Sequence, residues 1–320
     1  MDQPYPKDLM EFEAQFGSEE ACRAYLQRLR WPDGFVCPRC QHPIAWPAGR
    51  QRLVCARCRY QASLTAGTLF QDTHKPLGLW FRAMWHVTSQ KNGTSALGLQ
   101  RVLGLGSYVT AWTWLHKFRR AMGRPGRDQL AGRVEVDETY LGGEAAGPRG
   151  RGSLGKSLVV IAAQEDGKRI GRIRLARVAD ISALSLCQFV QQAIAPGSCV
   201  HTDGLNAYGD LEALGYRHEV SVLRGKGKEA ATELLPRVHL VASLLKRWLL
   251  GTHQGSFGPD QLDYYLDEFT FRFNRRTSAS RGKLFYRLME QAVAVDPKPY
   301  KMIAGGKSLH PQSVGVDGVN

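Results

Sequence analysis

Four cysteines form the pattern in this sequence that most directly indicates a metal site. Cys37 and Cys40 form one C-x2-C pair, and Cys55 and Cys58 form a second pair after fourteen intervening residues. Each pair presents two thiolates from a tight turn, so the two pairs together can complete a tetrahedron around zinc. The alternatives are a chance spacing or two disulfides, and a cytoplasmic setting disfavours disulfides. Because four protein ligands close the coordination sphere, the spacing predicts a structural Zn²⁺ rather than a catalytic one.

Two aspartates could form a second metal site of a different kind. Asp137 follows the alternating stretch that begins at Arg133, and Asp203 follows the apolar stretch that begins at Ser198. We expect each aspartate at the end of a strand. Two such carboxylates side by side could hold two Mg²⁺ (or Mn²⁺) ions ~4 Å apart for in-line phosphoryl transfer. Either aspartate alone could instead cap a turn.

A third ligand is expected from a helix predicted to begin at Pro236. His239 lies in its first turn, and an imidazole can bind a divalent metal. It is softer than a carboxylate and lacks its charge, so it should bind Mg²⁺ less tightly than Glu. Glu233, just before the helix, is the competing carboxylate. Lys246 lies two helical turns after His239 on the same face and could meet a phosphate.

Strand parity separates the acidic neighbours of Asp137. Glu135 lies two residues earlier and shares the strand face of Asp137, whereas Glu138 points to the other face. This favours Asp137 as the ligand, with Glu135 as an acidic neighbour.

The elements that would position these side chains predict a mixed α/β fold. Apolar and alternating patterns predict three strands, then a helix, then a fourth strand: 133–137, 157–163, 169–177, 181–194 and 198–203. A further helix is expected at 207–214. This order is that of a ribonuclease-H-like sheet with flanking helices, in which the first and fourth strands are neighbours. Asp137 and Asp203 would then lie close together.

The segment between the cysteines and the sheet predicts a helix-turn-helix. Residues 76–122 have helical periodicity, with a turn at Gly104-Leu-Gly106. A helix, a glycine-containing turn and a second helix have the proportions of a helix-turn-helix. The candidate residues for DNA contact in the second helix are Tyr108, Thr110, Lys117 and Arg119.

The charge of the chain favours a polyanionic partner. The formal net charge is +14, and neutralisation of phosphates by such a surplus favours nucleic acid. A merely soluble basic protein is the alternative reading. The remaining candidates for DNA contact are Arg39 and Arg57 beside the cysteines, Lys246 and Arg247 in the helix from Pro236, and Arg275 at the end of a helix predicted at 264–276.

Several motifs together resemble bacterial insertion-sequence transposases of the insertion sequence 1595 type. They are the four cysteines, Val134–Gly143, His201–Tyr208, Leu244–His253 and Tyr265–Arg276, and the resemblance covers nearly the full length. It implies a zinc ribbon, a DDE-like ribonuclease-H-fold domain, metal-dependent DNA cleavage and strand transfer, and recognition of terminal inverted repeats. Asp137 and Asp203 match the acidic pair. Thirty-five residues then separate Asp203 from His239, as in acidic triads whose third member is usually Glu.

These patterns predict five regions in the chain. They are an N-terminal helical segment (1–30), a zinc ribbon (31–64), a helix-turn-helix DNA-binding domain (65–124), a ribonuclease-H-like catalytic domain (130–295) and a flexible tail (296–320). The expected partner is double-stranded DNA, both the terminal inverted repeats and the target, with a homo-oligomer forming on it. The sequence has neither a membrane-length apolar run nor a signal-peptide pattern. We therefore expect a cytoplasmic, nucleoid-associated protein.

Two functions fit this sequence. The first is an active DDE-type transposase with His at the third position. The alternative is a transposon-derived DNA-binding regulator without catalysis, which the zinc ribbon and helix-turn-helix fit equally well. A zinc-dependent hydrolase is a distant third, because the cysteine spacing leaves no open coordination position.

Overall fold

The chain folds into two compact units. The computed structural model describes residues 5–49, 52–123, 126–142, 156–221, 234–255 and 257–305. One unit comprises Met1–Arg124 with Thr277–Lys307, and the other comprises Pro125–Arg276 with Ser308–Asn320. None of the helices within the described ranges combines the length and hydropathy needed to cross a membrane.

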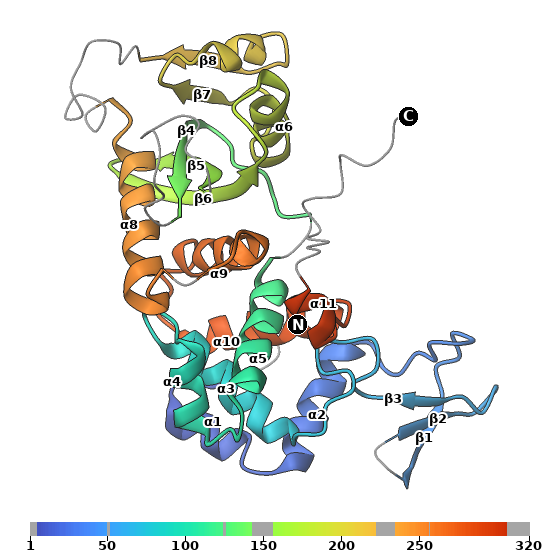
Figure 1. Cartoon of the computed structure of the whole chain (residues 1–320). Coiled ribbons are helices and arrows are strands. Elements are labelled where there is room, and N and C mark those ends of the chain that lie inside the picture. Colours follow the sequence, from blue (N-terminus) through green and yellow to red (C-terminus); the bar gives the residue numbers. More distant parts are fainter. Residues whose placement is uncertain are drawn as a thin grey trace. The chain divides into compact units, whose positions relative to one another are not determined.

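The first unit is a helical assembly with a small sheet attached (Figure 1). Its helices are α1 (Leu9–Gln15), α2 (Glu19–Arg30), α3 (Leu77–Ser89), α4 (Ala96–Leu103), α5 (Tyr108–Met122), α10 (Arg281–Ala294) and α11 (Tyr300–Ala304). Helix α10 returns from the C-terminal part of the chain and packs against α2, α3 and α5. The predicted catalytic domain, residues 130–295, includes α10, whereas the structure groups it with the N-terminal helices.

An aromatic cluster explains why α10 belongs to the first unit. Phe285 of α10 is fully buried. Its ring lies 5.6 Å from that of Phe12, 6.0 Å from Phe81 and 5.8 Å from Trp85, between ring centroids. Aromatic rings at these separations stabilise a core beyond the area they bury. The cluster therefore fixes α10 against α3, about 200 residues earlier in the chain, and against α1, about 270 residues earlier.

Helices α4 and α5, joined by the turn at Gly104-Leu-Gly106, are the two helices that the sequence predicts on either side of this turn. Ser95 Oγ accepts a hydrogen bond from the Gly98 N–H and caps α4. Gly104 ends α4 in the left-handed region with φ 61°, where a residue without Cβ has no steric penalty. The indole rings of Trp80 and Trp114 stack with centroids 3.8 Å apart, which ties α5 to α3.

The small sheet of the first unit has three antiparallel strands. They are β1 (Ala45–Ala48), β2 (Arg52–Cys55) and β3 (Gln61–Ser63), in that order. Cys55 ends β2, so the second cysteine pair turns the chain from β2 into β3. The sheet is the scaffold on which the two cysteine pairs meet.

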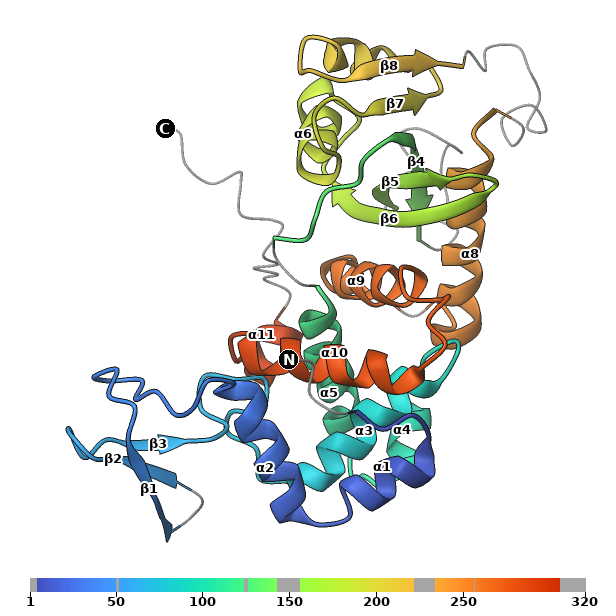
Figure 2. The same ribbon diagram turned by 180° about the vertical axis from the view of Figure 1, so that it is seen from behind.

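The second unit contains a five-stranded mixed sheet (Figure 2). Its strands are β4 (Arg133–Leu141), β5 (Ser157–Asp166), β6 (Arg169–Val178), β7 (Cys199–Thr202) and β8 (Arg217–Val220), in the order β6-β5-β4-β7-β8. β4, β5 and β6 pair antiparallel, and β4, β7 and β8 pair parallel. The first and fourth strands of this unit are neighbours, as a ribonuclease-H-like sheet requires.

Helices cover both faces of this sheet. On one face, α8 (Pro236–His253) and α9 (Leu262–Phe273), which follows the short turn η3 (Pro259–Gln261), share a core with residues such as Ile161 and Ile173. On the other face, α6 (Ala183–Ala193) and the turn η2 (Asn206–Leu211) pack on Val134 and Val136. Side chains alternate along β4. Its odd-numbered residues therefore face α8.

Candidate functional site

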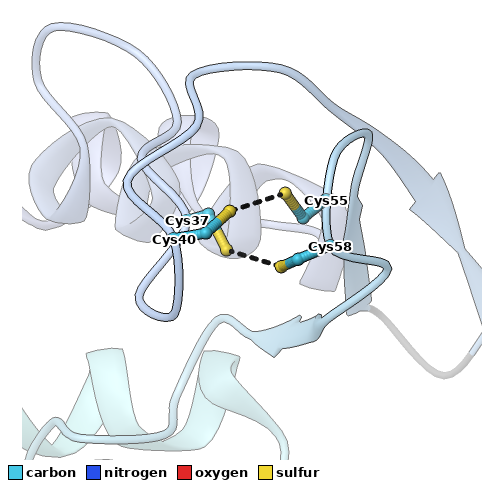
Figure 3. Close-up of side chains that lie close together, drawn as sticks. All are labelled: Cys37, Cys40, Cys55 and Cys58. Atoms are coloured by element: carbon cyan, nitrogen blue, oxygen red, sulfur yellow. Dashed lines mark hydrogen bonds between the residues drawn. The ribbon is translucent and has the colours of Figure 1, made fainter.

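The four cysteines converge as their spacing predicts (Figure 3). Cys37 Sγ lies 3.6 Å from Cys58 Sγ, and Cys40 Sγ lies 3.6 Å from Cys55 Sγ. All four sulfurs lie within 4.8 Å of one another. Four sulfurs bound tetrahedrally to Zn²⁺ at ~2.3 Å would lie ~3.8 Å apart, so the arrangement fits a structural zinc ion.

Asp137 and Asp203 each lie two residues beyond the point where β4 and β7 stop pairing. The last paired residues are Glu135 and His201, and continuing that register by two residues places Asp137 opposite Asp203. The carboxylate of Asp203 accepts a hydrogen bond from the Leu205 N–H at 3.0 Å, which fixes the turn after β7. Since neighbouring strands lie ~4.8 Å apart, both aspartates belong to one end of the sheet.

The prediction that Asp137 ends its strand is wrong. β4 continues for four residues beyond it to Leu141, because β5 pairs with it antiparallel from Val134 to Leu141. Only β7 stops beside Asp137, since β7 ends at Thr202. Asp137 is therefore held rigidly by β5 on one side and open on the side where β7 has ended.

His239 approaches Asp137 from α8. Its Nε2 lies 3.8 Å from Asp137 Oδ2, and it has no hydrogen-bond partner within the described parts of the chain although it is buried. Burial is the main cause that lowers the pKa of His239. The carboxylates of Glu135 and Asp203 raise this pKa, and the Lys246 ammonium lowers it. The lowered pKa favours the neutral imidazole, which is the form that binds metals.

A cavity of about 400 Å³ lies between β4 and α8. The side chains that could serve a phosphate substrate there are Asp137, Thr139, His239, Ser243 and Lys246. Thr139 lies two residues after Asp137 on β4, and Ser243 lies one helical turn after His239. Those spacings were available in the sequence, so the strand and helix periods could have added both residues to the predicted site.

Glu138 belongs to the other face of the sheet. Its carboxylate accepts a hydrogen bond from the buried hydroxyl of Tyr208 in η2. Burial, followed by the charge of Glu138, raises the pKa of Tyr208 well above its usual range, so the phenol stays a donor. The parity that separates Glu138 from Asp137 in the sequence is present in the structure.

The donor set suits a hard divalent cation. Carboxylate oxygens are the ligands that Mg²⁺ and Mn²⁺ prefer, and a neutral imidazole can join them. Two atoms bound to one ion at ~2.1 Å lie ~3 to 4 Å apart, which includes the 3.8 Å between His239 and Asp137. Within the described ranges, however, only the cysteines form a group of three or more ligands within 4.8 Å of one another. The competing Glu233 lies outside the described residues.

Comparison with known proteins identifies the family. Residues 129–274 match the model of the ISXO2-like transposase domain, and residues 17–61 match that of the transposase zinc-ribbon domain. The chain is 30% identical over 278 residues to an "Uncharacterized protein in transposable element ISH50" of Halobacterium salinarum, a match that covers 80% of this chain and 91% of that protein. This chain belongs to the insertion sequence 1595 type of transposases.

Most of the residues predicted to contact DNA are accessible in this transposase. Exposed are Arg39 and Arg57 in the zinc ribbon, Tyr108 at the start of α5, and Lys246 and Arg247 on α8. Thr110 is half-buried. These residues stay candidates for DNA contact.

The prediction that Arg119 contacts DNA is wrong, because its side chain is only 2% exposed. It lies one turn after the buried Leu115 and beside Phe118, on the packed face of α5. Lys117 is also drawn inward: its Nζ donates to the Leu69 carbonyl at 3.4 Å and lies 5.7 Å from the Trp80 ring centroid. Neither side chain is presented to DNA in this structure.

The end of α9 is tied to the protein itself. Arg275 donates to the Phe271 carbonyl at 3.2 Å and stacks over the Phe271 ring at 4.0 Å. Asn274 accepts from the Ile173 N–H and donates to the Ile173 carbonyl, at 2.7 and 3.1 Å. Asn274 thus satisfies the backbone of β6, an edge strand whose groups would otherwise be unpaired. The predicted DNA contact of Arg275 therefore competes with contacts to its own helix.

Proposed function

We propose that this transposase binds the terminal inverted repeats of its insertion sequence and cleaves and joins DNA strands with divalent metal ions. The observation that carries the proposal is the 3.8 Å between His239 of α8 and Asp137, at the end of the sheet where strand register also places Asp203. The cavity beside Asp137 and His239 has Lys246 on its wall. A carboxylate, an imidazole and a cation around one cavity suit a phosphodiester.

Each of these side chains has a distinct task in the proposed reaction. Asp137 and Asp203 would hold Mg²⁺ or Mn²⁺, and His239 would be the neutral third ligand. When bound, the ions lower the pKa of the attacking hydroxyl and neutralise the charge that develops on the phosphate and on the leaving oxygen. Lys246, on the same wall, would orient the phosphate.

The proposed reaction has two steps, hydrolysis at the element's end and transfer of the freed strand to target DNA. In the first, water attacks the phosphodiester at the element's end, a P–O bond to the attacking oxygen forms, and the bond to the 3′ oxygen breaks. The leaving oxygen takes a proton and becomes a free 3′-OH. In the second step that 3′-OH attacks a phosphodiester of target DNA, and a target 3′-OH leaves. Because an element has two ends that must be joined to one target, we propose that the protein acts as a homo-oligomer on DNA.

Strand cleavage is the direct test. A labelled duplex that carries one element end is incubated with the full-length protein and Mg²⁺ or Mn²⁺, and cleaved strands are resolved on a denaturing gel. Asp137→Asn and Asp203→Asn are expected to lose cleavage by roughly 10²-fold or more while still binding the duplex. Asp210→Asn, the same change at an exposed residue of η2, should cleave normally. An Asp137→Asn variant that cleaves like the wild type would contradict the proposal.

A transposon-derived regulator without catalysis is the second candidate. Two observations favour it: His239 stands where acidic triads usually carry Glu, and the aspartates and His239 do not converge as closely as the cysteines do. The same assay separates the two functions. Repeat binding without cleavage in either metal would favour the regulator.

A further inference from the structure

Helix α8 begins without a cap of its own. Leu235 occupies the N-cap position and gives no side-chain hydrogen bond, and the first turn contains no acidic residue. The first N–H groups of a helix have no partner within the helix, so buried ones must be satisfied from elsewhere. Pro236 at the first position removes one of them, but Arg237 and Val238 still carry theirs.

Glu135 of β4 supplies the missing cap. Its Oε2 accepts hydrogen bonds from the backbone N–H of Arg237 at 2.7 Å and of Val238 at 3.0 Å. Its Oε1 accepts from the Arg237 guanidinium at 2.8 Å. The carboxylate is 1% exposed. A buried carboxylate with three donors, two of them at the positive end of a helix, is a strong and directional contact.

The same arginine extends the contact across the sheet. Arg237 Nη2 donates to Glu165 at the end of β5, at 2.5 Å, and to the Gly167 carbonyl at 2.8 Å. Glu165 in turn binds Arg133, which binds Glu219 of β8. Through Arg237, the first turn of α8 contacts both β4 and β5, the strands on which the helix packs (Figure 1).

This contact lies two residues from each partner of the proposed metal pair. Glu135 precedes Asp137 by two residues on the same strand face, and Arg237 precedes His239 by two residues in the same helical turn. We propose that Glu135 is a positioning residue, which caps α8 and thereby sets His239 against Asp137. The inference rests on the proposed function only in taking that pair as a metal site. The three donors occupy the carboxylate, so Glu135 acts through the helix and not as a ligand.

Amide hydrogen exchange and Mn²⁺ binding test this role together. In Glu135→Gln, the Arg237 and Val238 amides should exchange roughly tenfold faster or more, while the amides of β5 keep their protection. The dissociation constant for Mn²⁺, measured by calorimetry on the protein alone, should rise roughly tenfold. Glu135→Asp keeps the charge but is one methylene shorter. Glu135→Asp should also show faster amide exchange and weaker Mn²⁺ binding, and it replaces Glu135→Gln in the test if that variant does not fold.

Glu165→Gln is the matched control. It removes the other carboxylate partner of Arg237 but leaves the two N–H groups capped, so both amides and the Mn²⁺ affinity should stay within about twofold of the wild type. Protected amides in both Glu135 variants would overturn the cap. If Mn²⁺ binds more weakly but the Arg237 and Val238 amides stay protected, Glu135 is a metal ligand and not a positioning residue. If both amides exchange faster but Mn²⁺ binds normally, Glu135 caps α8 without positioning His239. If His239→Ala and Asp137→Asn both bind Mn²⁺ normally, the proposed function fails and the cap still stands.

Discussion

The zinc ribbon and the end of the mixed sheet are two candidate metal sites built in opposite ways. In the ribbon, four identical ligands come from two local turns, and their sulfurs already lie within 4.8 Å of one another. At the sheet, the three proposed ligands are of two chemical types and come from β4, from the turn after β7 and from α8. Their positions depend on strand register and on one helix cap.

The difference follows from what each site has to do. A structural zinc ion needs a closed shell of soft ligands, and its binding energy contributes directly to folding. A site that transfers phosphoryl groups has to keep positions free for water and phosphate oxygens. The wider spacing around Asp137, beside a cavity of about 400 Å³, suits the second requirement. Loss of a ligand should therefore unfold the zinc ribbon, whereas at the sheet it should abolish strand cleavage without unfolding the domain.

The largest expected effect is at the ribbon. Cys55→Ser should abolish stoichiometric zinc, as measured by mass spectrometry, and should release the amides of β1 to β3 to nearly unprotected exchange, since structural zinc contributes on the order of 10 kcal/mol. The amides of β5 should keep their protection. Cys187→Ser is the control, because this buried thiol of α6 lies outside the cluster. Full zinc content in Cys55→Ser would mean that the cysteines do not hold the metal.

A smaller, purely functional effect is expected at His239. His239→Ala should lose roughly 10²-fold or more in strand cleavage with unchanged repeat binding and unchanged thermal stability. His239→Glu should retain cleavage with Mg²⁺, because a carboxylate is the harder ligand. His74→Ala, at an exposed histidine of the other unit, controls for the loss of an imidazole. Full cleavage by His239→Ala would favour Glu233 or a site with two ligands.

The smallest effect should come from the exposed arginines of the ribbon. Arg57→Ala should weaken binding evenly across DNA sequences and reduce the slope of log affinity against log salt by roughly one. Zinc content should not change, because Arg57 lies on the surface of the second cysteine turn. Fluorescence anisotropy with a salt series measures the slope. An unchanged slope would leave the ribbon a structural module without this phosphate contact.

The two sites also differ in how far the sequence predicts them. The ribbon depends on residues at most 21 positions apart, and the C-x2-C spacing predicts all four ligands. At the sheet, strand parity correctly places Asp137 and Glu138 on opposite faces. β4 is four residues longer than its local pattern predicts, because pairing with β5 decides where the strand ends.

Long-range contacts account for what the sequence missed. The absence of a capping residue before α8 is visible in the sequence, but its partner lies 102 residues away, and no local rule connects them. Arg119 differs for another reason: its position one turn after Leu115 places it on the buried face of α5, and its charge alone does not make it exposed. Asn274 is a third case, since its partner Ile173 is 101 residues away.

Pulsed electron paramagnetic resonance of Mn²⁺ bound to the protein and element-end DNA tests whether Asp137, Asp203 and His239 hold the metal. We expect bound Mn²⁺ with a directly coordinated nitrogen that disappears in His239→Ala, and loss of the bound Mn²⁺ signal in Asp137→Asn and Asp203→Asn. Bound Mn²⁺ without a coordinated nitrogen, or a nitrogen signal that persists in His239→Ala, would contradict it.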